Sequence, residues 1–222
     1  MNPQDWSEVA ALVATGTLQT LYMVALATLA TIAGGLPLGV LLCVARKPGV
    51  FDAPRAAAVL GFAINIGRSV PFVVLLIALI PLTRLVVGTS LGSTAAVVPL
   101  AIGAIPFFAR VVEASLDEVD RGRIEAIVAM GGTARHVVRD VLLPEAFPSL
   151  LAGLTLTVVM LIGFSSMAGV VGGGGLGDLA IRYGYQRFNQ RVMLATVVVL
   201  VVLVQAVQMS GDRLTRVLAQ RR

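Results

Sequence analysis

The chain has 222 residues, of which 57% are apolar and 13% charged, and its mean hydropathy is +0.92. Soluble domains carry roughly 25% charged residues, so this composition excludes a water-soluble globular protein. The net charge of +5 does not indicate a nucleic-acid partner, because the basic residues gather on one side of the predicted membrane spans.

The N-terminal segment, residues 1–16, carries Asp5 and Glu8 and no Lys or Arg. It lacks the positively charged start of a cleavable signal peptide, and we expect it to stay attached as an extracytoplasmic segment. The only cysteine, Cys43, and the only histidine, His136, are too few for an internal disulfide or a metal site. We expect Cys43 to pack against other helices or lipid and His136 to lie on a solvated helix face.

Five apolar runs are long enough to cross a membrane: residues 17–44, 57–80, 94–112, 149–171 and 192–209. They predict an all-α membrane protein with five transmembrane helices, a transmembrane domain over 17–209 and a basic tail over 210–222. Gly34, Gly35 and Pro37 in the first run are positions at which another helix can approach closely or the helix can kink.

The second run contains a basic residue, Arg68, followed by Ser69 and by the helix breaker Pro71. A charge near the middle of the bilayer costs about 2.5–3.5 kcal/mol on insertion scales, so Arg68 is expected to face the bundle interior or a wet cavity. Pro71 frees the carbonyl of Gly67 one turn earlier. We favour a guanidinium that satisfies such carbonyls over one that contacts a substrate carboxylate, and both interpretations stay open.

A polar segment, residues 113–147, separates the third and fourth runs. Residues 123–130 predict a short helix, which Gly131 and Gly132 end. Thr133 is then a good N-cap for a second helix ending at Pro144, with Val137, Val138, Val141 and Leu142 on one side and Arg135, Arg139 and Asp140 on the other. The pattern fits a docking loop outside the bilayer or an amphipathic hairpin on the membrane surface.

The fourth run carries hydroxyl and thioether side chains that ordinary helix packing explains well. Some of them are also candidates for lining a solute path, and with Arg68 and Ser69 the candidate pathway residues are Ser165, Ser166 and Met167. The GVVGGGGLGDLA segment that follows has no Lys followed by Ser or Thr after its last glycine, so it is no phosphate loop. Its glycines predict a sharp turn of the chain.

Basic residues distribute unequally between alternate sides of the five runs, and the richer side is cytoplasmic. Four lie on one side, Arg84, Arg182, Arg187 and Arg191. Twelve lie on the other: Arg46, Lys47, Arg55, Arg110, Arg121, Arg123, Arg135, Arg139, Arg213, Arg216, Arg221 and Arg222. The N-terminus is therefore predicted outside, and residues 113–147 and the C-terminus in the cytoplasm.

Apart from acids at the ends of the runs such as Glu113, the apolar runs contain no Asp or Glu. A proton relay or coupling-ion site in the membrane needs such carboxylates, so a solute pump built on this chain takes its energy from another subunit. The single histidine lies in the polar segment, so no catalytic set can assemble in the bilayer. We predict that the chain is not itself an enzyme.

The polar segment resembles the EAA loop of ABC-transporter permeases, in which E-A-A is followed by three residues, G, nine residues and I-x-L-P. Ile127 stands in place of the second alanine and Val141 in place of the isoleucine, and all spacings fit. The resemblance assigns coupling to a partner ATPase to Glu125, Ala126, Ile127, Gly131, Leu143 and Pro144. We further expect the helix to lie in a groove of that ATPase and to bury Ile124, Ile127 or Val128 there.

Further segments are similar to the permeases of bacterial methionine importers: residues 66–90, 103–113, 174–185 and 211–216. The resemblance implies a type I ABC permease in the bacterial cytoplasmic membrane, working as a homodimer. It also implies two cytoplasmic ATPase subunits that bind ATP and Mg, and an extracytoplasmic lipoprotein that delivers methionine. The alternatives are a permease for another small amino acid or osmolyte and, from a different class, a passive channel or structural membrane subunit.

Overall fold

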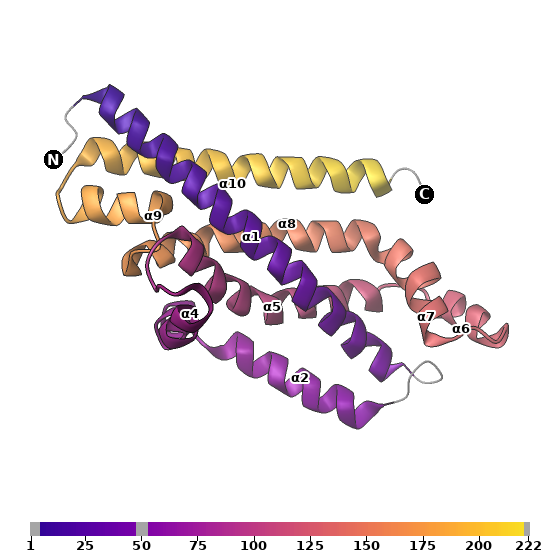
Figure 1. Ribbon diagram of the computed structural model, residues 1–222. Helices are drawn as coiled ribbons and strands as arrows, with labels where there is room; N and C mark the ends of the chain where they lie inside the picture. Colours follow the sequence, from indigo (N-terminus) through magenta and orange to yellow (C-terminus); the bar gives the residue numbers. More distant parts are fainter. Residues whose placement is uncertain (1–4, 48–52, 220–222) are drawn as a thin grey trace. The chain divides into compact units, whose positions relative to one another are not determined.

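The structure is a computed structural model that describes residues 5–47 and 53–219 (Figure 1). All regular structure in these ranges is helical, which confirms the all-α class. The longer helices are α1 (Trp6–Arg46), α2 (Pro54–Ser69), α5 (Ser93–Asp117), α6 (Arg121–Ala129), α8 (Leu143–Ala168) and α10 (Gln190–Ala219). The shorter ones are α3 (Phe72–Ala78), α4 (Ile80–Val87), α7 (Ala134–His136), η1 (Val137–Leu142), η2 (Gly169–Val171), α9 (Gly175–Leu179) and η3 (Ala180–Tyr185).

Four helical segments of the described ranges are long and apolar enough to cross a membrane: 6–46, 93–117, 134–171 and 190–218. The second predicted run is different, because it is broken between α2 and α3 rather than continuous over 57–80. Counting this broken pair as one span gives the predicted five.

The break falls at Val70 and Pro71. Pro71 takes an extended conformation with φ −57° and ψ 133° and precedes the first residue of α3. Proline has no N–H for the helical ladder, and its ring disfavours the helical conformation of the residue before it. The same proline that was expected to disturb one carbonyl therefore ends α2 altogether.

Other helix ends also lie beyond the predicted boundaries. α1 begins at Trp6, so most of the N-terminal segment 1–16 is helical, and α10 carries the tail of 210–222 on as helix to Ala219. α5 extends to Asp117, so Glu113 lies within a helix and not at its end. Residues 1–4 of the N-terminal segment and Arg221 and Arg222 of the basic tail lie outside the described residues.

The chain divides into two compact units, and several helices contribute residues to both. Unit 1 comprises Met1–Ala30, Val70–Gly103 and Val158–Met209. Its core joins the start of α1 to α9 and α10 through five buried side chains, Val9, Val13, Leu176, Leu179 and Val192. In the same unit the rings of Phe72 and Phe164 stack with their centroids 4.1 Å apart.

The glycine-rich segment of unit 1 turns the chain as predicted. Gly172, Gly174 and Gly175 have φ values between 77° and 79°, a range that suits glycine. The N–H groups of Gly175 and Leu176 donate to Gln19 Oε1 at 2.8 Å and to Thr20 Oγ1 at 2.9 Å. Side chains of α1 thus hold the start of α9.

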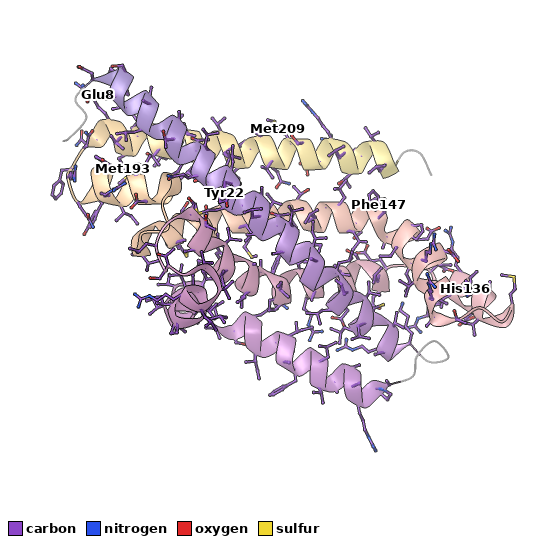
Figure 2. The ribbon with its side chains drawn as sticks, in the orientation of Figure 1. Glu8, Tyr22, His136, Phe147, Met193 and Met209 are labelled. Carbon is purple, nitrogen blue, oxygen red and sulfur yellow. The ribbon has the colours of Figure 1, made fainter. Side chains whose placement is uncertain are left out.

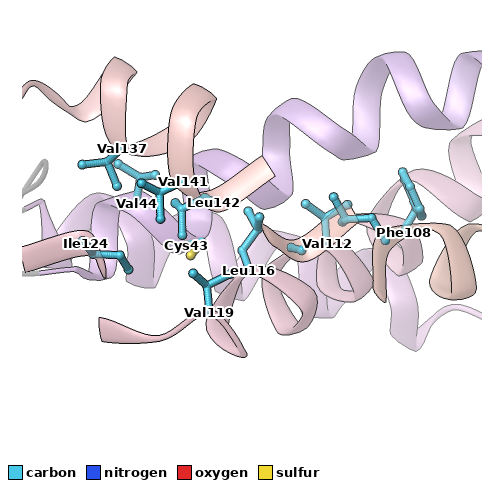
Figure 3. Close-up of a cluster of buried hydrophobic side chains, with 12 residues drawn as sticks. Cys43, Val44, Phe108, Val112, Leu116, Val119, Ile124, Val137, Val141 and Leu142 are labelled. Carbon is cyan, nitrogen blue, oxygen red and sulfur yellow. The ribbon is translucent and has the colours of Figure 1, made fainter. Parts of the chain in front are cut away.

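Unit 2 comprises Thr31–Ser69, Ala104–Thr157 and Ser210–Arg222. Its main core gathers side chains from α1, α5, α6, η1 and α8, with Cys43 among them (Figure 3). Cys43 is buried, as expected. α1 and α5 approach closely at the predicted small residues, because a Cβ added at Gly35 would lie 3.0 Å from Phe108 Cδ1.

Candidate functional site

The site is the helical segment between α5 and α8, and its first element is α6. Asp120 caps this helix, with Oδ1 accepting from the N–H of Arg123 at 3.3 Å. Ile124 is only 6% exposed and belongs to the core of unit 2, and Ile127 and Val128 pack against the same core. The apolar side of α6 therefore faces its own chain, and Ile124 is not available to a partner's groove.

The opposite side of α6 is exposed. It presents Glu125, Ala126 and Ala129, and Met130 follows at the end of the helix. The large apolar side chain of Met130 lies at the tip of the site and is 75% exposed. These four exposed residues, Glu125, Ala126, Ala129 and Met130, form the outer face of α6.

The turn after α6 has fixed geometry. Gly131 has φ 81°, and its N–H donates to Val128 O at 3.0 Å while the N–H of Gly132 donates to Ile127 O at 2.9 Å. These two bonds make a Schellman motif, the helix end that favours glycine at the left-handed position. The predicted helix stop is confirmed, and the positive φ explains why glycine stands at 131.

The second helix of the segment starts after Thr133, as predicted. Thr133 has an extended backbone, and its N–H donates to His136 Nδ1 at 3.1 Å. His136 is exposed on this helical segment (Figure 2). The predicted sides are also confirmed: Val137, Val141 and Leu142 are buried, and Arg135, Arg139 and Asp140 are exposed.

The prediction that Pro144 ends this helix is wrong. Residues 137–142 form a π-helix, η1, that continues directly into α8 with Pro144 in its first turn. The N–H of Leu143 donates to Val138 O, five residues back. Proline is tolerated in a first helical turn, and the wider π turn before it lets the chain pass into α8 without a stop. Leu143 is half-buried and Pro144 exposed.

An ion pair fastens α6 to α8. The guanidinium of Arg123 donates to Glu145 Oε1, and their side chains are 59% and 34% exposed. Glu145 lies in the first turn of α8. The site is thus joined to a membrane-spanning helix by a covalent path through η1 and by a polar contact.

A buried carboxylate lies beside the site. Glu113 is 5% exposed and accepts from Arg46 Nη1 at 2.5 Å and from Arg110 Nη1 at 2.6 Å. Arg110 also donates to Gly61 O and Asn65 Oδ1, both at 2.9 Å. This cluster links α1, α2 and α5 next to α6.

Sequence reasoning treated Glu113 as an acid at the end of a run and missed the cluster. The only local signal was the spacing of Arg110 and Glu113, three residues apart on one helix face. Arg46 lies 67 residues away in sequence, so its part in the cluster had no local signal.

The candidate pathway residues fall into two groups that belong to different units. Arg68 and Ser69, in unit 2, are exposed at the end of α2, with the Arg68 guanidinium carbon 5.8 Å from the Phe107 ring centroid. Ser69 Oγ donates to Asn65 O at 2.8 Å. In unit 1, Ser165 and Ser166 donate to Ile162 O at 2.7 and 3.3 Å, and Met167 is 45% exposed. The three hydroxyls bond to the carbonyls of their own helices, which favours the packing interpretation.

Comparison with known proteins identifies the class of transport protein to which the chain belongs. A family model described as "Binding-protein-dependent transport system inner membrane component" matches residues 35–222. The chain belongs to this family of transport permeases, and its helices have the type I ABC permease fold.

Individual relatives point to a narrower class within this family. The chain is 54% identical over 205 residues to the probable D-methionine transport system permease protein MetI of Vibrio cholerae, covering 92% of this chain and 91% of that protein. It is 40% identical over 181 residues to the methionine import system permease protein MetP of Bacillus subtilis, covering 82% of each. A chain of the inward-facing MetNI methionine ABC transporter matches with a TM-score of 0.92 and 44% identity, over 94% of this chain and 97% of that one. These matches confirm the resemblance to methionine-importer permeases.

Proposed function

We propose that the chain forms the translocation path for methionine in an ATP-driven importer of the bacterial inner membrane. The similarity to methionine permeases over almost the whole chain supports the substrate. In this proposal a partner subunit binds ATP and Mg and hydrolyses the ATP, and the exposed side of α6 serves to bind that subunit. The chain itself is not catalytic.

The observation that carries the proposal is the outer face of α6. Glu125 and Ala126 of the coupling motif lie on it, with Met130 exposed at its end. A short helix that shows small residues beside one exposed apolar side chain suits a groove of a partner protein. A passive channel has no need of such a face.

The other motif residues act in this proposal by holding that face in place. Ile127 packs against the core of unit 2, Gly131 makes the turn, and Leu143 and Pro144 begin α8. A push on α6 by the ATPase reaches α8 through η1 and through the ion pair of Arg123 with Glu145. Motion of α8, which carries Ser165, Ser166 and Met167, changes access to the path.

In this proposal the N-terminus lies outside the cell and the C-terminus in the cytoplasm. The distribution of basic residues, 12 on the predicted cytoplasmic side and four on the other, supports this orientation. An extracytoplasmic binding lipoprotein then delivers methionine. Two copies of the chain form the path and bind two ATPase subunits, since five spans offer few faces to enclose a sealed channel and closed two-fold pairs are the commonest assembly. Arg68 stays the candidate for contact with a substrate carboxylate.

Uptake by reconstituted vesicles tests the function. Vesicles that contain the permease, its ATPase and the binding lipoprotein should accumulate labelled methionine only with ATP inside the compartment that the ATPase faces. Excess unlabelled methionine should compete, and lysine at equal concentration should not. Competition by lysine would favour a permease for other amino acids, and uptake without ATP would favour the passive channel.

A further inference from the structure

A small cavity of about 90 Å³ lies inside unit 1. Its walls come from α3 and α4, from the start of α5, and from the end of α8 with η2. Of the eleven described residues that line it, only Thr83 and Ser90 have polar side chains, and none is charged. Liquid water takes about 30 Å³ per molecule, so the cavity has room for roughly three non-hydrogen atoms of a ligand. It suits the end of a small apolar side chain and excludes a charged one.

The hydroxyl of Thr83 lines this cavity without a partner in the described chain. Thr83 is 3% exposed, and its Oγ1 forms no hydrogen bond with any described residue. A threonine in a helix often donates to the carbonyl four residues earlier, as Thr155 and Thr157 do in this protein. Burying a hydroxyl without a partner costs free energy, and a ligand atom that accepts from Thr83 removes that cost. A thioether sulfur is a weak acceptor of this kind.

A guanidinium lies at the rim of the cavity. Arg84, in the last turn of α4, donates from Nε to Oγ of the wall residue Ser90 at 3.2 Å. Arg84 is exposed, and its two Nη nitrogens donate to no described residue. The N–H donors of a guanidinium match the geometry of a carboxylate. The site therefore combines an apolar cavity, one hydroxyl inside it and a carboxylate-binding group beside it.

Two turns of the chain meet beside the cavity. The N–H of Gly92 donates to Gly172 O at 2.9 Å, which joins the turn before α5 to the turn after η2. Leu91 and Gly173, the chain neighbours of these two glycines, line the cavity. Separation of the two turns at this hydrogen bond would give a ligand access to the cavity.

We propose that the cavity receives the side chain of methionine during transport, with the thioether sulfur at Thr83 and the carboxylate at Arg84. The inference rests on the proposed function, which supplies methionine as the ligand. The atoms of methionine beyond its Cβ, which are Cγ, Sδ and Cε, match the volume of the cavity. Lysine does not fit, because its ammonium group would be buried without a counter-ion.

Protection of a cysteine tests the site. Ala96 lines the cavity and is 6% exposed, so Ala96→Cys in a Cys43→Ala background places a thiol in it. The full chain, purified in detergent, is treated with methyl methanethiosulfonate, and the rate of labelling is measured. Methionine at about ten times its half-protecting concentration should slow labelling about tenfold, and lysine at the same concentration should not. Tyr185→Cys, at a 70% exposed position, is the control whose rate neither amino acid should change.

Variants in the Ala96→Cys background assign the two polar contacts. Thr83→Val keeps the shape of the side chain and removes the hydroxyl. It should raise the half-protecting concentration of methionine about two- to threefold, the lower range for one hydrogen bond. That of norleucine, which has a methylene in place of the sulfur, should not change. Arg84→Gln should raise both about fivefold, the upper value for an exposed ion pair. Arg182→Gln, at an arginine paired with Asp178, should change neither.

A filled cavity gives a further check. Ala95 is a wall residue and is 1% exposed, so Ala95→Ile occupies the space that the methionine side chain would take. It should abolish protection by methionine, and thermal unfolding of the same sample shows that the variant is folded.

Two kinds of result would overturn the proposal. One is an Ala96→Cys thiol that reacts equally fast with and without methionine, or that never reacts, since no methionine then enters the cavity. The other is equal protection by lysine and methionine, or a Thr83→Val variant that weakens norleucine as much as methionine. Uptake of methionine by reconstituted vesicles is measured separately. Uptake without protection would therefore remove this site and leave the proposed function standing.

Discussion

Arg123 of α6 and Glu145 of α8 form an ion pair across the turn that Gly131 makes between them. The pair joins the helix proposed to meet the ATPase to the helix proposed to move. Because both side chains are partly exposed, we expect it to stabilise the chain by about 0.2–1 kcal/mol. In the proposed function its larger role is to keep α6 and α8 moving together.

Charge reversal tests this role. Arg123→Glu or Glu145→Arg alone should lower methionine uptake by up to about fivefold at an unchanged rate of ATP hydrolysis, since up to about 1 kcal/mol of coupling is lost. The double reversal restores the attraction and should restore most of the uptake. Uptake and hydrolysis are measured in the same vesicles at equal amounts of inserted permease. A double variant as weak as the singles would show that the pair does not couple the two helices.

Gly131 offers a test that rests on the backbone alone. A Cβ at this position has no atom within 4 Å, so the cost of substitution comes from its φ of 81°. A left-handed conformation costs about 1–2 kcal/mol for an ordinary residue, and Asn adopts it more readily. Gly131→Val should therefore insert but lose most uptake, while Gly131→Asn should keep it. Equal uptake by the two variants would mean that the left-handed turn is not required.

The buried Glu113 should matter more for stability than for coupling. Glu113→Gln leaves Arg46 and Arg110 without their shared carboxylate. Breaking a fully buried ion pair lowers the free energy of unfolding by about 3–5 kcal/mol. Because the side chain of Arg46 is 48% exposed, we expect Glu113→Gln to lower it by about 1–3 kcal/mol. Asp117→Asn is the matched control, because the distance between Lys47 Nζ and Asp117 Oδ1 is longer and the Asp117 side chain is 53% exposed. In thermal unfolding in detergent, Glu113→Gln should lower the midpoint temperature, and Asp117→Asn should leave it almost unchanged.

The orientation in the membrane is tested by labelling single cysteines in a Cys43→Ala background. Tyr185 and Met130 are 70% and 75% exposed, so a cysteine at either is accessible to a reagent on its own side. With the N-terminus outside, an impermeant thiol reagent applied to intact cells should label Tyr185→Cys and not Met130→Cys. The cells express the permease without its ATPase, which would otherwise cover Met130, and after disruption both cysteines should be labelled. The reverse pattern would contradict the orientation and the cytoplasmic docking face together.

The parts of the site that were predicted depend on neighbours within a few residues. Gly131 at a helix end and the buried side of Val137, Val141 and Leu142 follow from the spacing of residues along one helix. Pro144 was misjudged for a related reason: proline usually stops a helix, and nothing local distinguishes an α-helical turn from the π turn that precedes α8.

The parts that were missed depend on contacts far apart in sequence. The apolar side of α6 was visible, but an apolar side does not show whether its own chain or a partner covers it, and here Ile124 packs into the core of unit 2. The burial of Glu113 depends on Arg46, which belongs to another helix. The break at Pro71 had a local cue, but the sequence did not show that α2 would end there completely.

The most consequential prediction concerns the outer face of α6, where the large apolar side chain of Met130 is exposed at the tip of the polar segment, residues 113–147. In the isolated permease its substitution should change stability by no more than about 0.5 kcal/mol, as is usual for exposed positions. In the complex the same side chain would be buried in the groove of the ATPase. Truncating an anchor of this kind costs about 1–2 kcal/mol of binding free energy. Met130→Ala should therefore weaken ATPase association about five- to thirtyfold, and Met130→Asp more.

Two further variants make the result specific. Leu214→Ala, at an exposed apolar position outside the polar segment, should leave association unchanged. Ile124→Ala should instead destabilise the permease itself by about 2–4 kcal/mol, because it leaves a cavity in the core of unit 2. Association is measured by titrating detergent-solubilised permease with the ATPase, and stability by thermal unfolding of the permease alone. If Met130→Asp bound the ATPase with unchanged affinity, the outer face of α6 would not be the docking surface, and the segment would fit the amphipathic hairpin on the membrane surface instead.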